Sequence, residues 1–301
     1  MSRWGAALQY RAWWVVSAAV GNLPLRVSYG IATVVGWLGY YGWSRGRKAM
    51  HANYRVVLPG SPAGEIRRVA RQSLVNYCRY LVDFVRLPRL SPEDVRWLVD
   101  GNGQFELLDN VLAGGKGAVI VCMHFGNWDV GAGAAAARGY AVTAVAETFG
   151  DARLDAMVVG SRERLGMRVV KMEKAGPSLF RALKENGLLA LLVDQPRAGD
   201  GVKSTFFGRE IEVPAGPARI ALRTGSQVVP AAFAREAPWR AGVVTLCDFG
   251  VELPDSGDRD ADVRELTQRI VASHEAFIRE RPEQWYMFRR MFGGVPGTVA
   301  G

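Results

Sequence analysis

Residues 117–129 read Gly-Ala-Val-Ile-Val-Cys-Met-His-Phe-Gly-Asn-Trp-Asp, and the interpretation of the chain starts from them. The run over residues 118–123 is short, apolar and rich in β-branched side chains, which predicts a buried strand. Gly126 and Asn127 break this strand before a stretch of small residues that predicts a helix over residues 128–138. His124 is therefore expected in a strand-to-helix loop.

A histidine followed by a carboxylate at such a turn is typical of a general base. Five residues along one continuous helix would place the two side chains about 140° apart, so His124 and Asp129 can meet only if Asp129 lies in the first turn after the loop. An imidazole whose Nδ1 hydrogen is held by a carboxylate keeps its Nε2 lone pair free to deprotonate an alcohol. The alternative is a core histidine satisfied by a helix-capping aspartate, since short motifs also match by chance.

Beyond this motif, predicted strands alternate with predicted helices. We expect strands over 118–123, 140–146, 168–172, 187–193, 227–234 and 241–248, and helices over 128–138, 152–165, 176–185, 215–224 and 261–280. The alternation predicts an α/β fold with a largely parallel sheet flanked by helices. An amphipathic helix is expected over residues 65–87, and we expect residues 61–301 to form one domain.

The N-terminal block has a different composition. The 301-residue chain has a net charge of +9, and its first 64 residues contain seven Lys or Arg and no Asp or Glu. The Trp and Tyr residues of this block lie within apolar runs and the cations lie outside them, a pattern typical of contact with anionic lipid and not with nucleic acid. Residues 27–44 are uncharged but contain four glycines, which favours an interfacial helix pair over a membrane span. We therefore expect residues 1–60 to form a helical, membrane-associating segment.

Other polar residues follow predicted strands, where ligands bind in parallel sheets. Glu147 follows the second strand, and Asp194 follows the apolar strand over 187–193. A carboxylate in that position is costly to desolvate without a partner, and His124 is one candidate. The alternative for Asp194 is a turn-forming residue before Pro196.

Several further residues have simpler interpretations. Cys78, Cys122 and Cys247 are too scattered for a disulfide framework or a metal cage, and Cys122 is expected to be a buried thiol. His274 lies on an apolar helical stripe and is expected to be packed and hydrogen-bonded. Arg219, near the start of a proline-opened helix, could hold an anionic group. No metal is expected.

A series of short motifs runs along nearly the whole chain from Leu23 onward: His124-Phe-Gly-Asn-Trp-Asp129, Ala146-Glu147, Arg162-Glu-Arg-Leu-Gly166, Asp194-Gln195, Phe206-Phe-Gly208, Pro214-Ala-Gly-Pro217, Thr224-Gly225, Pro230 and Arg281-Pro-Glu-Gln-Trp285. This ordered set resembles the bacterial lipid A lauroyl/myristoyl acyltransferase family, which includes the mycobacterial phosphatidylinositol mannoside acyltransferases. The resemblance implies a glycerolipid acyltransferase-like α/β fold and an O-acyltransferase activity.

The resemblance also implies roles for single residues. His124 would be the catalytic base and Asp129 would assist it, with Asp194 in the same relay where the mannoside enzymes have a glutamate. Glu147 and Arg162 match the family's Glu and Arg, and we expect them to bind substrate together with two further residues, Asn127 and Arg219.

The implied reaction has no covalent acyl-enzyme and no cofactor. His124 would take the proton of a glycolipid hydroxyl, of a lipid A precursor or a phosphatidylinositol mannoside, as its oxygen attacks the thioester of acyl-CoA or acyl carrier protein. The protein would act at the cytoplasmic face of the cell inner membrane, on a surface with anionic lipids.

Two alternatives are open. A thioesterase or lipase would use water in place of the acceptor, but the Gly-x-Ser-x-Gly elbow of a serine hydrolase is absent from the sequence. An inactive membrane-bound scaffold would tolerate the loss of His124. The sequence does not choose among glycolipid acceptors.

Overall fold

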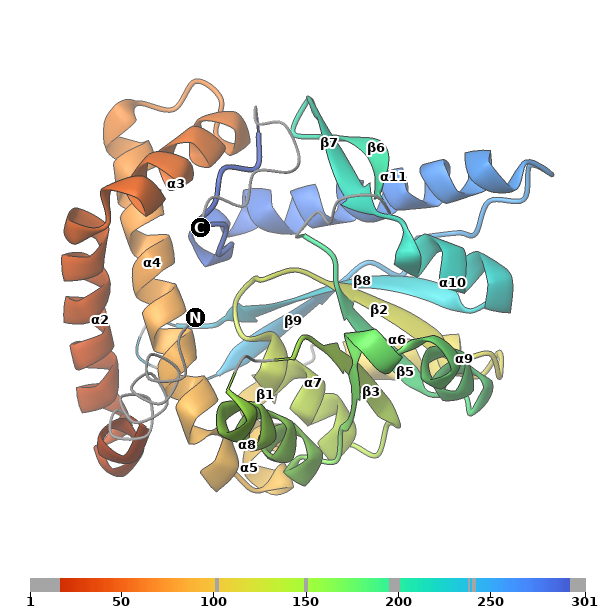
Figure 1. The fold of residues 1–301 in the computed structure, drawn as a ribbon, viewed down its shortest axis with the longest axis horizontal. Helices are drawn as coiled ribbons and strands as arrows, with labels where there is room; N and C mark the ends of the chain where they lie inside the picture. Colours follow the sequence, from red (N-terminus) through yellow and green to blue (C-terminus); the bar gives the residue numbers. More distant parts are fainter. Residues whose placement is uncertain are drawn as a thin grey trace.

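The computed structural model describes residues 17–100, 103–148, 151–194, 201–237, 239 and 242–292. The cations and aromatic residues before residue 17, and Gln195 of the motif series, lie outside the described residues. The centre of the fold is a seven-stranded sheet in the order β1-β9-β8-β2-β5-β3-β4 (Figure 1). Its strands are β1 Val99–Asp100, β2 Ala118–Cys122, β3 Val142–Ala146, β4 Arg168–Lys171, β5 Leu188–Leu192, β8 Gln227–Arg235 and β9 Val243–Cys247.

The sheet is largely parallel, as the alternation of elements predicted. Strands β8, β2, β5, β3 and β4 run in one direction. Strand β9 pairs antiparallel with β8, and β1 pairs parallel with β9. Both faces of β2 are covered, because Val119 and Val121 on one face and Ala118 and Cys122 on the other are all buried. This explains why the strand reads as a continuous apolar run.

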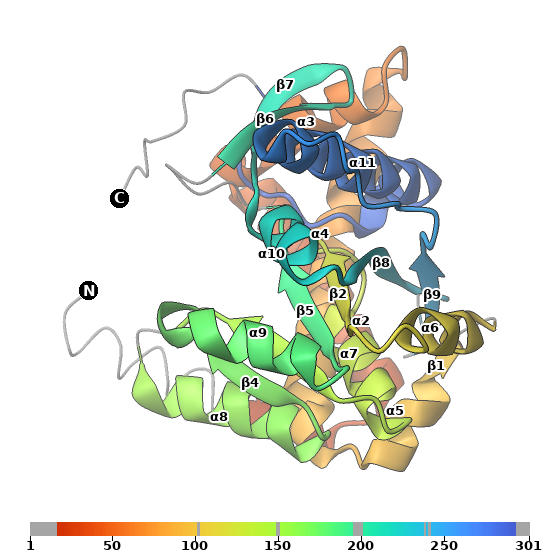
Figure 2. The same ribbon diagram turned by 90° about the vertical axis from the view of Figure 1, so that its right-hand side faces the viewer.

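Helices cover the two faces of the sheet (Figure 2). One face carries α5 Pro92–Leu98, α6 Gln104–Leu112, α7 Trp128–Ala137 and α8 Ala152–Arg164, and the other carries α9 Gly176–Lys184, α10 Gly216–Thr224 and α11 Arg259–Glu280. A separate antiparallel hairpin, β6 Gly201–Phe206 and β7 Arg209–Pro214, packs against α11. The sequence did not predict β1, α5, α6 or this hairpin, and the motif Phe206-Phe-Gly208 lies at its turn.

The N-terminal helices form a layer beside the sheet (Figure 1). They are α2 Leu25–Gly42, α3 Ser44–Val57 and α4 Ala63–Arg86. Helix α2 approaches α4 closely at Gly36, where a Cβ atom would lie 2.8 Å from the Cα atom of Val75. The predicted helix over residues 65–87 is confirmed as α4. Among the described residues, the structure contains no helix with the length and apolarity that crossing a membrane requires. A domain division at residue 60 stays a prediction.

Candidate active site

The register of two neighbouring strands brings His124 to Asp194. Strand β2 pairs parallel with β5, and Cys122 lies opposite Leu192, so the residues two positions further along each strand are level. The Asp194 Oδ1 atom lies 2.7 Å from Nδ1 of His124, and Oδ2 accepts the His124 backbone N–H at 2.9 Å. The carboxylate therefore holds the imidazole at two points.

Asp129 does not hold the imidazole, which corrects the prediction of a His124–Asp129 pair. Asp129 lies in the first turn of α7, as expected, but its Oδ1 accepts from Arg162 Nε at 2.7 Å and its Oδ2 accepts from the Tyr80 hydroxyl at 2.8 Å. The reason is the direction of the loop. Gly126 bridges to Phe233 on β8, whereas His124 faces β5 on the other side of β2.

Gly126 makes this loop possible. Its φ is +59°, and a Cβ atom there would lie 1.9 Å from the carbonyl oxygen of Phe233. Only glycine fits such a close approach with a left-handed backbone.

Asn127 belongs to the scaffold of the loop. Its Oδ1 caps α7 by accepting the Val130 N–H at 3.3 Å, and its Nδ2 donates to Asp83 Oδ2 at 2.9 Å. Its exposed fraction is 1%, which corrects the expectation that Asn127 contacts substrate. Its amide is used to fix the turn between β2 and α7.

A buried network of charged and polar side chains around Asp83 holds the loop between β2 and α7 through Asn127. Besides the Asn127 amide, the Asp83 carboxylate accepts from the Tyr29 hydroxyl at 2.5 Å and from the Arg235 guanidinium at 2.5 Å. Arg235 also donates to the Tyr29 hydroxyl at 2.9 Å. The sequence analysis missed these residues. What could have indicated them is a charged residue within an apolar pattern. Asp83 lies on the buried stripe of α4, and Arg235 ends the apolar strand β8.

The charges around His124 favour its cationic form. Burial lowers the pKa of the imidazole, but the Asp194 carboxylate, its hydrogen bond and the nearby Glu147 outweigh burial and the opposing Arg289 guanidinium, so the pKa of His124 is raised. Burial opposes the ionisation of Asp194, but the His124 contacts outweigh it, and the pKa of Asp194 is lowered. An ionised Asp194 thus stabilises the imidazolium that forms when Nε2 takes a proton.

His274 and Cys122 behave as the sequence predicted. His274 is buried, and its Nε2 lies 3.1 Å from the carbonyl oxygen of Val121. Burial lowers its pKa to about 4, so the ring is neutral and Nε2–H donates to that carbonyl. Cys122 is buried at the end of β2, and burial raises the pKa of its thiol.

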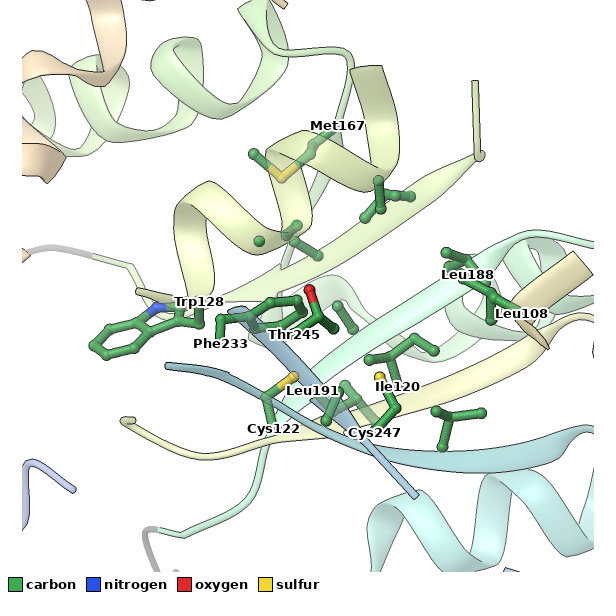
Figure 3. A pocket seen from close by; sticks show the side chains of 18 of the residues that line it. Leu108, Ile120, Cys122, Trp128, Met167, Leu188, Leu191, Phe233, Thr245 and Cys247 are labelled. Atoms are coloured by element: carbon green, nitrogen blue, oxygen red, sulfur yellow. The ribbon is translucent and has the colours of Figure 1, made fainter. Parts of the chain in front are cut away.

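An apolar cavity lies between the sheet and helices α6 and α7 (Figure 3). The cavity and the open solvent that adjoins it together occupy about 930 Å³. Trp128 lines one end, and Leu108 and Leu188 line the other. Leu188 and Leu192 are four strand residues apart, which is about 13 Å. The apolar lining therefore extends for about 13 Å along the strands.

The end of the cavity that Trp128 lines adjoins His124. The Trp128 indole lines the cavity and meets the His124 imidazole edge to face, with ring centroids 5.1 Å apart. Asp129 and Arg162 also line the cavity, and they are its charged lining residues. His124 itself stands outside the lining, with 26% of its side chain exposed. An apolar chain in the cavity would thus have its polar end beside the imidazole.

The remaining predicted residues divide into two groups. Glu147 follows β3 at the same sheet edge as His124 and Asp194, and Arg162 of α8 reaches the cavity through its ion pair with Asp129. Arg219 is exposed on α10, which covers the sheet face opposite to the cavity. The structure therefore does not bring Arg219 to the cavity, because α10 packs its buried side against the other side of β2.

The chain is similar to known proteins over most of its length. The family model described as bacterial lipid A biosynthesis acyltransferase matches residues 2–293. The phosphatidylinositol mannoside acyltransferase of Mycobacterium tuberculosis (strain ATCC 25618 / H37Rv) is 26% identical over 286 residues, covering 93% of this chain and 86% of the relative. The protein of the same name from Mycolicibacterium smegmatis (strain ATCC 700084 / mc(2)155) is 28% identical over 261 residues, covering 83% and 81%. The chain therefore belongs to the bacterial lipid A biosynthesis acyltransferase family and is an O-acyltransferase.

Proposed function

We propose that the protein transfers a fatty acyl group from an acyl thioester to a hydroxyl of a membrane glycolipid, with His124 as general base and Asp194 as the residue that orients it. The observation that carries this proposal is the 2.7 Å contact between His124 Nδ1 and Asp194 Oδ1 beside the Trp128 end of an apolar cavity. The His124–Asp194 pair supplies a general base, and the cavity supplies a place for the acyl chain.

The reaction proceeds in two proton transfers around one acyl transfer. Nδ1–H of His124 donates to Asp194, and Nε2 removes the proton of the acceptor hydroxyl as its oxygen attacks the thioester carbonyl. A carbon–oxygen bond forms, the carbon–sulfur bond breaks, and the thiolate takes the proton from the imidazolium. The products are an ester and a free thiol.

The oxyanion of the tetrahedral intermediate needs hydrogen-bond donors. We assign this role to two backbone N–H groups in the first turn of α7. The backbone N–H groups of Trp128 and Asp129 are the first two of α7, so no carbonyl group within the helix accepts a hydrogen bond from them. The helix dipole adds partial positive charge at this end. The Asp129 contacts with Arg162 and Tyr80 would then serve to hold this turn in place.

The substrates follow from the cavity and the relatives. The apolar cavity would hold the acyl chain, and acyl-CoA or acyl carrier protein would present its thioester at the Trp128 end. The named relatives act on phosphatidylinositol mannoside, which supports a glycolipid acceptor of that type or a lipid A precursor. No cofactor beyond the donor enters the reaction.

We also assign membrane association to the outer face of α2. This face exposes large apolar side chains, Val27, Ile31, Val34, Val35, Trp37, Leu38 and Tyr41. Exposed cations flank it at Arg26, Arg45 and Lys48. An apolar face beside cations suits an anionic lipid surface, and we place the enzyme at the cytoplasmic face of the cell inner membrane.

The direct test is acyl transfer from radiolabelled palmitoyl-CoA into a panel of glycolipids. Wild type should give a labelled glycolipid, His124→Ala should give none, and His51→Gln should match the wild type because His51 pairs with Tyr40 on the N-terminal helices. Labelled fatty acid alone, still dependent on His124, would establish a hydrolase instead. Turnover with neither this donor nor an acyl carrier protein donor would point to a scaffold.

A further inference from the structure

The C-terminal strap, residues 285–291, lies against the catalytic loop. Tyr286 N–H donates to the carbonyl of His124 at 2.8 Å, and Trp285 bridges to Phe125. Asn53 of α3 holds the other side of the strap, because its Nδ2 donates to the Arg289 carbonyl at 2.8 Å and its Oδ1 accepts the Met291 N–H at 2.9 Å. The strap is thus fixed between His124 and α3 (Figure 1).

A row of aromatic rings connects the catalytic loop to the end of α2. From His124 outward, neighbouring ring centroids lie 5.1, 4.2, 5.7, 5.0 and 6.1 Å apart. The rings of this aromatic row are, in order, Trp128, Tyr80, Tyr77, Phe288 and Trp43. Four separate segments supply them, so the row is not a feature of one helix.

The aromatic row is not sealed inside the core. Tyr80 is buried, but Trp128, Tyr77 and Phe288 are half-buried, and 44% of Trp43 is exposed. Trp43 directly follows α2, whose outer face exposes the apolar side chains described above. The row therefore continues an exposed apolar face toward the catalytic histidine.

The row and the acyl cavity meet at Trp128. This indole lines the cavity and also stacks on Tyr80 at 4.2 Å. The donor and the acceptor must reach one imidazole from different directions, since the sulfur that releases the acyl group and the oxygen that receives it belong to different molecules. The cavity suits the acyl donor, and the aromatic row suits the acceptor.

Charge beside the row matches an anionic acceptor. Arg289 follows Phe288 and is exposed, and its guanidinium is close enough to His124 to oppose the protonation of the imidazole. A guanidinium binds a phosphate through paired N–H donors. The C–H face of a sugar ring is apolar and packs well on the face of an aromatic ring.

We propose that the aromatic row is the acceptor subsite, in which the headgroup of a glycosylated anionic phospholipid lies along the row. Its reacting hydroxyl lies at His124, a further ring of the headgroup packs on Phe288 and Trp43, and Arg289 binds its phosphodiester. This inference rests on the proposed glycolipid acyltransferase function. The lipid tails of the acceptor would stay along the outer face of α2.

Steady-state kinetics of transfer to phosphatidylinositol mannoside, with palmitoyl-CoA as donor, test the stacking role. Phe288→Ala and Trp43→Ala should each raise the acceptor KM about tenfold and leave the donor KM within about twofold. Trp97→Ala is the matched control, because this tryptophan is 82% exposed on α5 and lies outside the row. Because Trp43 is largely exposed, its variant tests the row even if Phe288→Ala is poorly folded.

A comparison of acceptors tests the phosphate role. Arg289→Gln should raise the KM for phosphatidylinositol mannoside about tenfold but not the KM for an alkyl mannoside without phosphate, and Arg289→Lys should restore part of the difference. Arg290→Gln is the neighbouring control. The inference is overturned if Trp43→Ala and Arg289→Gln keep the wild-type acceptor KM while His124→Ala is inactive. Transfer that survives His124→Ala would overturn the proposed function itself.

Discussion

Asp194 acts on His124 at two atoms, and this determines how the imidazole titrates. The carboxylate is buried and receives both the ring Nδ1–H and the backbone N–H of His124. The ionised partner raises the pKa of His124 above its ordinary value. A general base must be neutral before it accepts a proton, so transfer should increase with pH as the imidazole deprotonates through that raised pKa.

The close approach of Gly126 to β8 gives a prediction with a built-in control. Gly126→Ala should destabilise the protein and abolish transfer, because its Cβ would meet the Phe233 carbonyl oxygen at 1.9 Å. Gly139→Ala is matched, since Gly139 also has a positive φ, +96°, but has no atom within 4 Å of the added Cβ. Gly139→Ala should cost only about 1 kcal/mol of unfolding free energy. Urea denaturation of both variants checks this, and equal costs would contradict a specific role for Gly126.

Helix α7 creates the apolar cavity through its small residues. Gly131, Ala132 and Ala135 face the sheet across the cavity, where larger side chains would fill the space. The ring of Phe233 occupies the space that a side chain at position 131 would need, since a Cβ there would lie 2.1 Å from its Cδ1 atom. The small residues that predict a helix over residues 128–138 therefore also leave the cavity between this helix and the sheet.

Acyl chain length should follow the depth of this cavity. Ala135→Phe places a ring in the cavity and should shift the preferred donor toward shorter acyl-CoA chains. Leu108→Ala removes side-chain volume at the far end, lined also by Leu188, and should shift it toward longer chains. The ratio of kcat/KM across a series of acyl-CoA donors measures both shifts. Changes in the same direction would mean that the acyl chain lies elsewhere.

The N-terminal helices are tied to the catalytic loop across the molecule. Tyr29 of α2 and Asn127 of the loop bind the same buried carboxylate of Asp83. Helix α3 also holds the strap beside His124 through Asn53. Removal of residues 1–60 would therefore disturb the active site as well as any membrane contact. Single substitutions on the outer face of α2 are a cleaner test of membrane association.

Leu38→Glu should weaken binding to anionic vesicles. The Leu38 side chain is 69% exposed on the outer face of α2. Loss of its burial in lipid, together with a new negative charge, should reduce partitioning by about tenfold or more. Trp97→Glu, on a more exposed residue of α5, should have little effect. Co-sedimentation with phosphatidylglycerol vesicles at low and high salt checks this, and equal losses in both variants would contradict an α2 docking face.

Much of the fold could be predicted from local pattern, because periodicity and turn residues act within a few positions. The strand over 118–123, the break at Gly126 and the helices around them follow from such signals. The partner of His124 could not be predicted in this way. It depends on which strand lies beside β2 and on its register, and those are set by packing between segments about 70 residues apart. The sequence predicts Asp194 as a buried carboxylate in need of a partner, with His124 as one candidate. Asp129 was assigned to His124 from its place at the turn and from the family resemblance.

The aromatic row and the Asp83 network could not be predicted from local sequence patterns either. Trp128, Tyr80 and Phe288 come from segments far apart in the sequence, and each alone is an ordinary half-buried or buried ring. Asp83 and Arg235 pair across 152 positions. A charge on an apolar stripe was the available signal for that pair.

The most direct measurement is the pH dependence of kcat/KM for acyl transfer in the wild type, Asp194→Asn and Asp129→Asn. If Asp194 orients the base, Asp194→Asn should reduce kcat/KM by roughly 10²–10⁴. It should also move the acidic limb to lower pH, because the pKa of His124 falls without the carboxylate charge. Asp129→Asn should leave that limb at its wild-type position, since Asp129 binds Arg162 and Tyr80. A limb that moves with Asp129→Asn and stays fixed with Asp194→Asn would contradict the assignment.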